Sequence, residues 1–196
     1  GLSAGEIVSA KGSGVLLAEL TRAVAGQLKG NPGSLGWLAQ MEQYLGVTAT
    51  LTALADESGE PALRAPDLLV ALLKRNLDLE LADRLPPDRA VVLADRFREL
   101  YVDLGVPGSH LLPGAVEAIE LVRARGGRTV VVTAKYEPNA IRCLDHVGLV
   151  VDAVHGWRFG PAKAAALVEE GASVYVGDTP RDMEAAAAAG ARAVGV

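Results

Sequence analysis

The stretch Ser173-Val-Tyr-Val-Gly-Asp-Thr-Pro-Arg-Asp-Met183 decides the fold of the C-terminal half of the chain. Its apolar, β-rich start predicts a short strand, and Asp178 follows that strand directly. Asp182 comes four residues later, in the first turn of the next predicted helix, so we expect both carboxylates on the same side. Open parallel sheets bind ligands beyond the carboxyl ends of their strands. The stretch therefore predicts a polar site at the end of a strand.

Strand and helix patterns alternate around this stretch, from Leu112 to the end of the chain. Repeated strand–helix units imply a parallel sheet with helices on both faces and right-handed crossovers, which is an α/β fold. The predicted strands are Thr129–Thr133, Val151–Val154, Ser173–Val176 and Ala191–Val196. The predicted helices are Gly114–Arg125, Asn139–Val147, Ala162–Glu170 and Glu184–Ala189.

The first 111 residues have a different pattern, because nearly all of their apolar residues recur at helical spacing. One short tract, Glu6-Ile-Val-Ser9, is a candidate strand. Pro107-Gly108 begins the transition to the sheet half. The predicted helices are Val15–Leu28, Leu35–Leu45, Val47–Glu57, Pro66–Arg75, Leu77–Leu85 and Asp88–Leu104.

Composition narrows the class of protein. The 196 residues suit one domain, or a core domain with a small insertion, and half of them are apolar. The net charge of −5 argues against a nucleic-acid or anionic-membrane surface, which needs clustered Lys and Arg. No apolar run approaches the roughly 20 residues of a membrane span, and no signal peptide is recognisable. The single cysteine, Cys143, cannot form an internal disulfide, so we expect a cytoplasmic protein.

Four side chains at the predicted strand ends have chemistry that suits phosphate and a cation. The Thr133 hydroxyl can donate to a phosphate oxygen, and the Lys163 ammonium can stabilise charge on a phosphoryl group. Asp178 and Asp182 offer the hard oxygen ligands that suit Mg²⁺. Each also has a structural interpretation: Thr133 as a turn residue, Lys163 as a solvated side chain. Asp182 can cap its helix together with Thr179, which does not prevent metal binding.

The order of these motifs resembles the haloacid-dehalogenase superfamily of hydrolases, particularly its small phosphatases with a helical cap. The resemblance implies a Rossmann-like parallel sheet flanked by helices, together with an all-helical cap domain. It divides the chain into an unmatched, mostly helical segment (1–46), a helical cap (47–106) and a Rossmann-like core (107–196). The matching motifs are Leu112-Pro-Gly114, Val130-Val-Val-Thr-Ala-Lys135, Lys163 and Val176-Gly-Asp-Thr-Pro-Arg-Asp-Met183.

The resemblance also implies a reaction, the hydrolysis of a phosphomonoester through an aspartyl-phosphate intermediate. Thr133 and Ala134 would bind the phosphoryl group, and Lys163 would neutralise it. Asp178 and Asp182 would hold Mg²⁺, directly or through an outer layer of ligands. The expected partner is a small phosphorylated metabolite.

The family's nucleophile motif, Asp-x-Asp before the cap, has no counterpart here. The first aspartate of the chain is Asp56, and no Asp-x-Asp pair occurs anywhere. Aligning the motif over Leu2–Val8 or over Leu35-Gly-Trp37 supplies no carboxylate in either register. Loss of a nucleophile can cost about 10⁶ in rate, so we expect weak or absent phosphatase activity.

Three interpretations remain open at this point. The chain is a hydrolase whose N-terminal segment is altered or missing, a non-catalytic relative that binds a phosphorylated ligand or a protein, or a scaffold for a helical interaction module.

Other residues near the predicted site have a structural explanation. Trp157 and Phe159 border the loop before Lys163, where their side chains either contact a substrate or, as we favour, pack against the protein. The three histidines, His110, His146 and His155, are too dispersed to form a metal motif.

Overall fold

The computed structural model describes residues 35–64, 66–72 and 76–196. The chain divides into two compact units, the first ending at Ala115 and the second running from Val116 to Val196. The predicted strand Glu6–Ser9 and the predicted helix Val15–Leu28 lie outside the described residues. Within the described ranges, no helix is both long and apolar enough to span a membrane.

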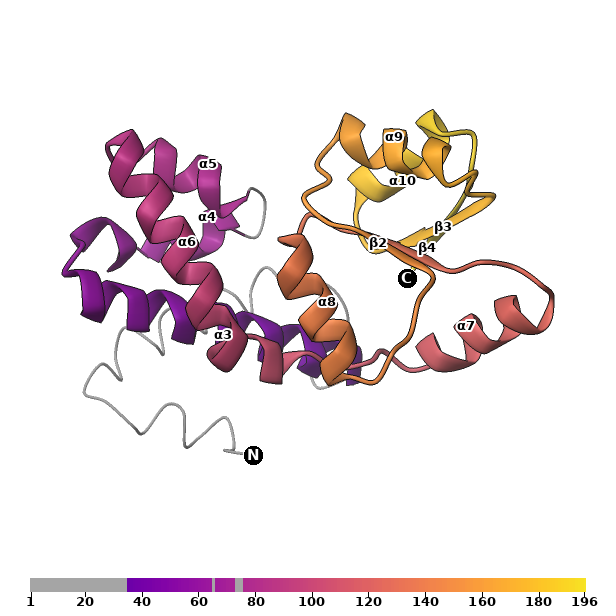
Figure 1. The fold of residues 1–196 in the computed structure, drawn as a ribbon, viewed down its shortest axis with the longest axis horizontal. Helices are drawn as coiled ribbons and strands as arrows, with labels where there is room; N and C mark the ends of the chain where they lie inside the picture. Colours follow the sequence, from indigo (N-terminus) through magenta and orange to yellow (C-terminus); the bar gives the residue numbers. More distant parts are fainter. Residues whose placement is uncertain (1–34, 65, 73–75) are drawn as a thin grey trace. The chain divides into compact units, whose positions relative to one another are not determined.

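The described part of the first unit is helical. Helix α3 packs along α6, and α5 packs on α6 as well, around a core that includes Leu54, Leu68, Leu81 and Leu93 (Figure 1). Its elements are α3 (Leu35–Ser58), η1 (Pro61–Arg64), α4 (Pro66–Leu72), α5 (Leu77–Ala82), α6 (Pro87–Leu104) and η2 (Val106–Gly108).

Helix α3 corrects one prediction. The sequence predicts two helices, Leu35–Leu45 and Val47–Glu57, whereas the structure has one continuous helix. Gly46, at the expected break, lies where α3 meets the chain after α6: a Cβ on Gly46 would lie 2.9 Å from the Cα of Gly105. The glycine therefore permits a close backbone approach and does not end the helix.

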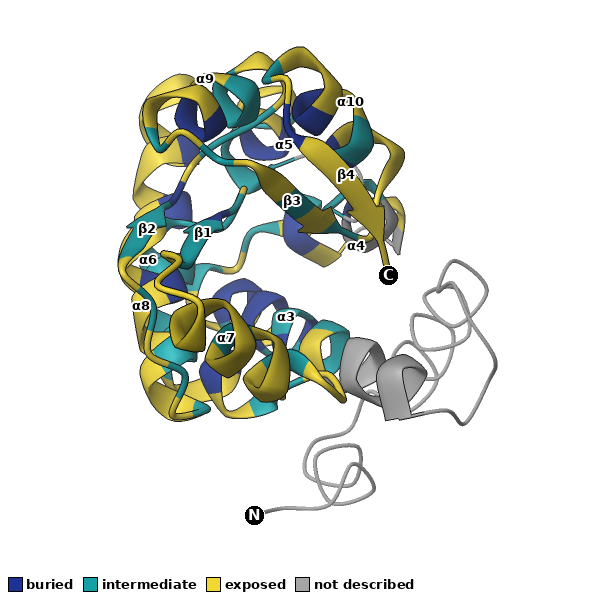
Figure 2. Ribbon diagram, turned by 90° about the vertical axis from the view of Figure 1, so that its right-hand side faces the viewer, coloured by how far each residue is buried: buried dark blue, intermediate teal, exposed yellow. Residues whose placement is uncertain are grey.

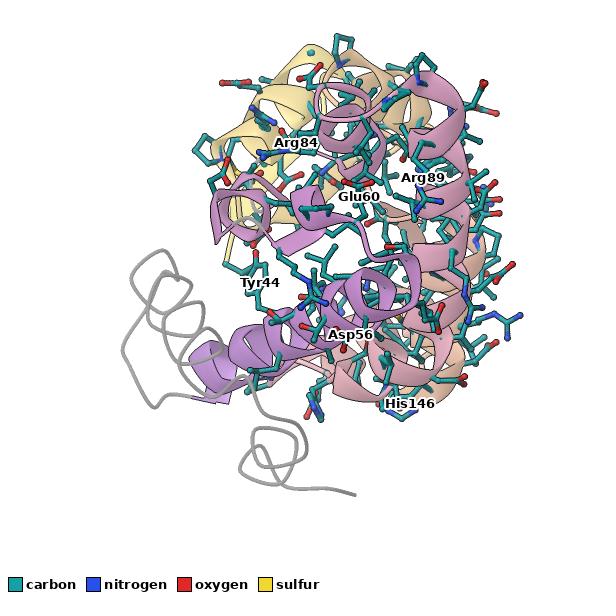
Figure 3. All side chains as sticks on the ribbon, turned by 90° about the vertical axis from the view of Figure 1, so that its left-hand side faces the viewer. Tyr44, Asp56, Glu60, Arg84, Arg89 and His146 are labelled. Atoms are coloured by element: carbon teal, nitrogen blue, oxygen red, sulfur yellow. The ribbon has the colours of Figure 1, made fainter. Side chains whose placement is uncertain are left out.

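Ion pairs join neighbouring elements on the surface of this unit. Arg89 of α6 lies 3.9 Å from Glu60 and donates to the carbonyl of Ser58, and Arg64 pairs with Asp56 at 2.6 Å (Figure 3). Exposed pairs of this kind contribute about 0–1 kcal/mol each. The apolar core, and not these pairs, therefore holds the unit together.

The second unit has the alternating order that the sequence predicts, and every element predicted for residues 116–196 is present. Its elements are α7 (Ala115–Ala124), β1 (Val130–Val132), α8 (Glu137–His146), β2 (Ala153–His155), α9 (Pro161–Glu169), β3 (Val174–Gly177), α10 (Pro180–Ala188) and β4 (Arg192–Gly195). The α/β class and the Rossmann-like organisation with a helical cap are thus confirmed.

All of the strand pairing in this unit is parallel, but the strands form two sheets and not one. β1 pairs with β2, and β3 pairs with β4 (Figure 2). Among the described residues, no backbone pairing joins β1 to β3. Side chains link them instead: the Tyr175 hydroxyl of β3 lies 3.1 Å from the Val132 carbonyl of β1, and Tyr175 packs in the same cluster as Val132. The expectation of one continuous sheet therefore needs correction, because the described chain offers no strand between β1 and β3.

Backbone alternation shows which groups face the β1–β3 boundary. Thr133 donates to His155 and Thr129 accepts from Asp152, so odd-numbered residues of β1 face β2. Ser173 and Gly177 likewise accept hydrogen bonds from the β4 segment. The even-numbered residues of each strand therefore turn their backbone groups away from the strand's partner. These residues are Val130, Val132, Val174 and Val176.

One face of the β3–β4 sheet is covered by helices and the other is exposed. On one face, Tyr175 packs with residues of α9 and α10, including Leu167 and Ala185. On the other face the valine side chains are exposed, and Figure 2 shows β4 in the exposed colour along its length. Helix α7 buries none of its residues. The exposed valines of this face are Val174, Val176, Val194 and Val196.

Candidate functional site

Thr133 directly follows β1, at the carboxyl end of the strand. Its backbone N–H donates to His155, and its carbonyl accepts from Arg158, so the residue is fixed between the two loops that follow β1 and β2. Its side-chain oxygen accepts the N–H of Lys135 at 3.2 Å. That bond uses an oxygen lone pair and leaves the hydroxyl proton free to donate. Ala134, the next residue, is exposed in the turn.

Lys163 lies in the first turn of α9 and reaches across to α10. Its ammonium contacts the carboxylate of Asp182 at 2.5 Å, and the two side chains are 15% and 5% exposed. Burial alone would raise the pKa of Asp182, but hydrogen bonds from Lys163 and Thr179 outweigh it and hold that pKa below its usual value. Asp182 is therefore a carboxylate at neutral pH, and it forms an ion pair with Lys163.

Asp182 also caps α10, as the alternative interpretation of its sequence position predicts. The Thr179 side chain accepts from the N–H of Asp182, and Asp182 accepts from the N–H and hydroxyl of Thr179, which completes a capping box. Gly177 allows this arrangement, because a Cβ there would lie 2.4 Å from the Cβ of Asp182. The turn from β3 into α10 thus fixes the position of this carboxylate.

The donor set does not fit an assembled magnesium site. One oxygen of Asp182 accepts from Lys163 and Tyr175, and the other accepts from Thr179, so direct coordination would displace one of these donors. Asp178, the other predicted ligand, is exposed. Among the described residues, no group of three or more His, Cys, Asp or Glu side chains is placed to hold a metal ion.

Tyr175 connects these residues and was not singled out from the sequence. Its hydroxyl lies 3.1 Å from the carbonyl of Val132 and 3.2 Å from the carboxylate of Asp182. Burial, with the nearby Asp182 charge, raises the pKa of Tyr175, so the phenol stays protonated. Thr133 follows Val132 directly, so Tyr175 links the Thr133 strand to the Lys163–Asp182 pair. A tyrosine within an apolar strand was the only sequence signal for this role.

Comparisons with known proteins point in one direction. A family model described as "Hydrolase: haloacid dehalogenase-like hydrolase" matches residues 28–190. A solved structure of a haloacid dehalogenase-like family hydrolase from Streptococcus pneumoniae is similar at a TM-score of 0.59 with 19% identity, covering 78% of this chain and 77% of that one. A hydrolase from Streptococcus pneumoniae TIGR4 gives a TM-score of 0.44 with 18% identity, covering 78% and 84% of the two chains. No curated protein matches the chain.

Proposed function

Because this chain belongs to the family of haloacid dehalogenase-like hydrolases, we propose that it binds phosphate monoesters and hydrolyses them weakly or not at all. The observation that carries this proposal is the boundary between β1 and β3. β1 ends directly before Thr133 and β3 directly before Asp178, and among the described residues no strand brings a carboxylate between them. The resemblance places the attacking carboxylate of the family on that central strand.

The chain's own residues have clear parts in phosphate binding. The Thr133 hydroxyl donates to a phosphate oxygen, and the Lys163 ammonium supplies positive charge from the first turn of α9. Asp182 holds Lys163 in place but also reduces the charge available to the ligand. We therefore expect modest phosphate affinity. A covalent step needs a carboxylate in line with the phosphorus atom, and none of these residues supplies one.

Magnesium, which the family resemblance implies, has a limited place in this proposal. Asp178 is the predicted ligand whose carboxylate is exposed to solvent, whereas Asp182 is already hydrogen-bonded through both oxygens. We propose that Mg²⁺ binds weakly, through Asp178, and that its affinity falls on Asp178→Asn.

Phosphate binding is tested by calorimetry with inorganic phosphate. Thr133→Val removes the hydroxyl with little change of shape, and Lys163→Met removes the charge; each is expected to weaken binding. Thr129→Val is the matched control, because Thr129 lies before the same strand and its hydroxyl contacts Asp152. Equal phosphate affinity in the wild type, Thr133→Val and Lys163→Met would overturn the proposed site.

Turnover is tested separately, with Mg²⁺ and a small phosphomonoester. We expect the wild type to release phosphate no faster than Asp178→Asn. Phosphate release well above that of the variant would instead favour an active hydrolase, with its nucleophile supplied from outside the described residues. That second candidate function is favoured by the retained Thr133, Lys163, Asp178 and Asp182.

A further inference from the structure

The loop between β2 and α9 has an unusual backbone. Trp157 has a φ of 54°, and among the described residues it is the only non-glycine residue with a positive φ. This conformation is costly for a bulky side chain and persists only where the surroundings impose it. The loop therefore holds the Trp157 backbone in this conformation at the expense of local strain.

Hydrogen bonds to the neighbouring loop impose this conformation. The N–H of Trp157 donates to the Lys135 carbonyl at 2.9 Å, and the N–H of Gly156 donates to the Glu137 side chain at 2.9 Å. The N–H of Arg158 donates to the carbonyl of Thr133, also at 2.9 Å. Arg158, the residue after Trp157, therefore has a direct backbone contact with Thr133, the proposed phosphate-binding residue.

The side chain of Trp157 is not buried, although its backbone is strained. Trp157 is 49% exposed and meets Tyr136 at a centroid distance of 5.4 Å, with the ring planes inclined by 60°. Packing alone does not explain a strained conformation that leaves half of a tryptophan in solvent. The exposed Trp157 ring beside the partly buried Tyr136, in the loops that follow β1 and β2, offers an apolar surface on which a flat ring can stack.

Arg158 adds a second observation. Its Nε atom is buried and has no hydrogen-bond partner within the described part of the chain. A buried donor without a partner is unfavourable, and an oxyanion is the acceptor that a guanidinium pairs with best. The backbone N–H of Arg158 donates to the Thr133 carbonyl, so Arg158 lies in the loop that is hydrogen-bonded to the proposed phosphate-binding residue.

We propose that Tyr136 and Trp157 form a subsite for a flat, unsaturated ring, so that the preferred ligands are phosphate monoesters that carry such a ring. The inference rests on the proposed function, because Thr133 receives the phosphate while the aromatic pair receives the ring. The ligand class is defined by this chemistry: one phosphate ester joined to a planar ring.

The test compares three ligands by calorimetry: inorganic phosphate, glycerol phosphate and phenyl phosphate. We expect phenyl phosphate to bind about tenfold more tightly than glycerol phosphate, the size of effect that aromatic contacts provide. Trp157→Gly should abolish that preference and leave inorganic phosphate binding unchanged, because glycine accepts the positive φ and preserves the loop. Trp157→Phe should keep part of the preference.

Fluorescence gives a second readout. The chain has two tryptophans, so Trp37→Phe leaves Trp157 as the only one, and phenyl phosphate should change its emission more than glycerol phosphate does. Equal affinity for the two esters, or a preference that survives Trp157→Gly, would overturn the ring subsite while phosphate binding stands. Failure of all three ligands to bind would overturn the proposed function and the subsite with it.

Discussion

The Asp182 carboxylate pairs with Lys163, accepts a hydrogen bond from Tyr175 and caps α10 through Thr179. These contacts come from three elements, α9, β3 and α10. The residue therefore joins the proposed site to the packing of the second unit, and its removal should affect stability before any ligand is added.

Replacing Asp182 with alanine is expected to lower the free energy of unfolding by about 3 kcal/mol, because it leaves the Lys163 charge without its partner in a largely buried place. Urea denaturation measures the change. Glu184→Ala is the control, since Glu184 is an exposed acid on the same helix and its loss should change stability by no more than about 0.5 kcal/mol. Equal effects of the two substitutions would contradict the structural role of Asp182.

The same carboxylate predicts a pH dependence. The pKa of Asp182 is lowered in the folded protein, so its contribution is present above the pKa of the unfolded state and is lost as pH falls through the folded pKa. The stability difference between wild type and Asp182→Asn should be large at pH 7, begin to shrink only below about pH 4, and disappear below the lowered pKa of the folded state. Urea unfolding across that range measures it, and a difference that stays constant with pH would contradict the assignment.

At the scale of elements, local periodicity predicted the helices and strands of residues 116–196 because each signal lies within the element itself. The break expected at Gly46 was wrong, because the glycine serves a contact with Gly105, 59 positions along the chain. Strand pairing is equally non-local, so the division into β1–β2 and β3–β4 was not predictable from these segments. The motif order put Lys163 and Asp182 at the same edge of the sheet, whereas their ion pair, the role of Tyr175 and the positive φ of Trp157 required tertiary contacts.

Gly46→Ala tests the close contact between α3 and the Gly105 segment. In an open helix this substitution would stabilise by about 1 kcal/mol. Here the added methyl group would meet backbone atoms of Leu104 and Gly105, so we expect a loss of about 1–3 kcal/mol. Gln43→Ala, an exposed change on the same helix, serves as the control. A stabilising effect of Gly46→Ala in thermal or urea unfolding would contradict the packing described.

Amide hydrogen exchange tests the division of the strands. The amides of Val130, Val132, Val174 and Val176 face away from the paired strands and should exchange faster than those of Val131 and Tyr175. The alternation within each strand is its own control for local burial. Equal protection of both sets would show that another strand pairs with these edges in solution.

At the scale of the whole molecule, the chain has two compact units with separate hydrophobic cores. The first core contains residues of α3, η1, α4, α5 and α6, and the second contains residues of β1, α9 and α10. Separate cores permit separate unfolding transitions, since cooperativity follows shared packing.

We therefore expect two transitions in urea. In the Trp37→Phe background, the fluorescence of Trp157 reports the second unit, while far-ultraviolet circular dichroism reports the helices of both. Gly46→Ala should move the dichroism transition to lower urea and leave the Trp157 transition in place. A single coincident transition that moves as a whole would show that the units unfold together.

The strand edges at the β1–β3 boundary have a practical consequence for anyone who concentrates this protein. Strand amides that have no strand partner among the described residues, beside the exposed Val174 and Val176, are a template for intermolecular β-association, so losses to precipitation should grow with concentration. A lysine in place of Val176 would act as a gatekeeper against such stacking, because a charged side chain on an edge strand repels an incoming copy.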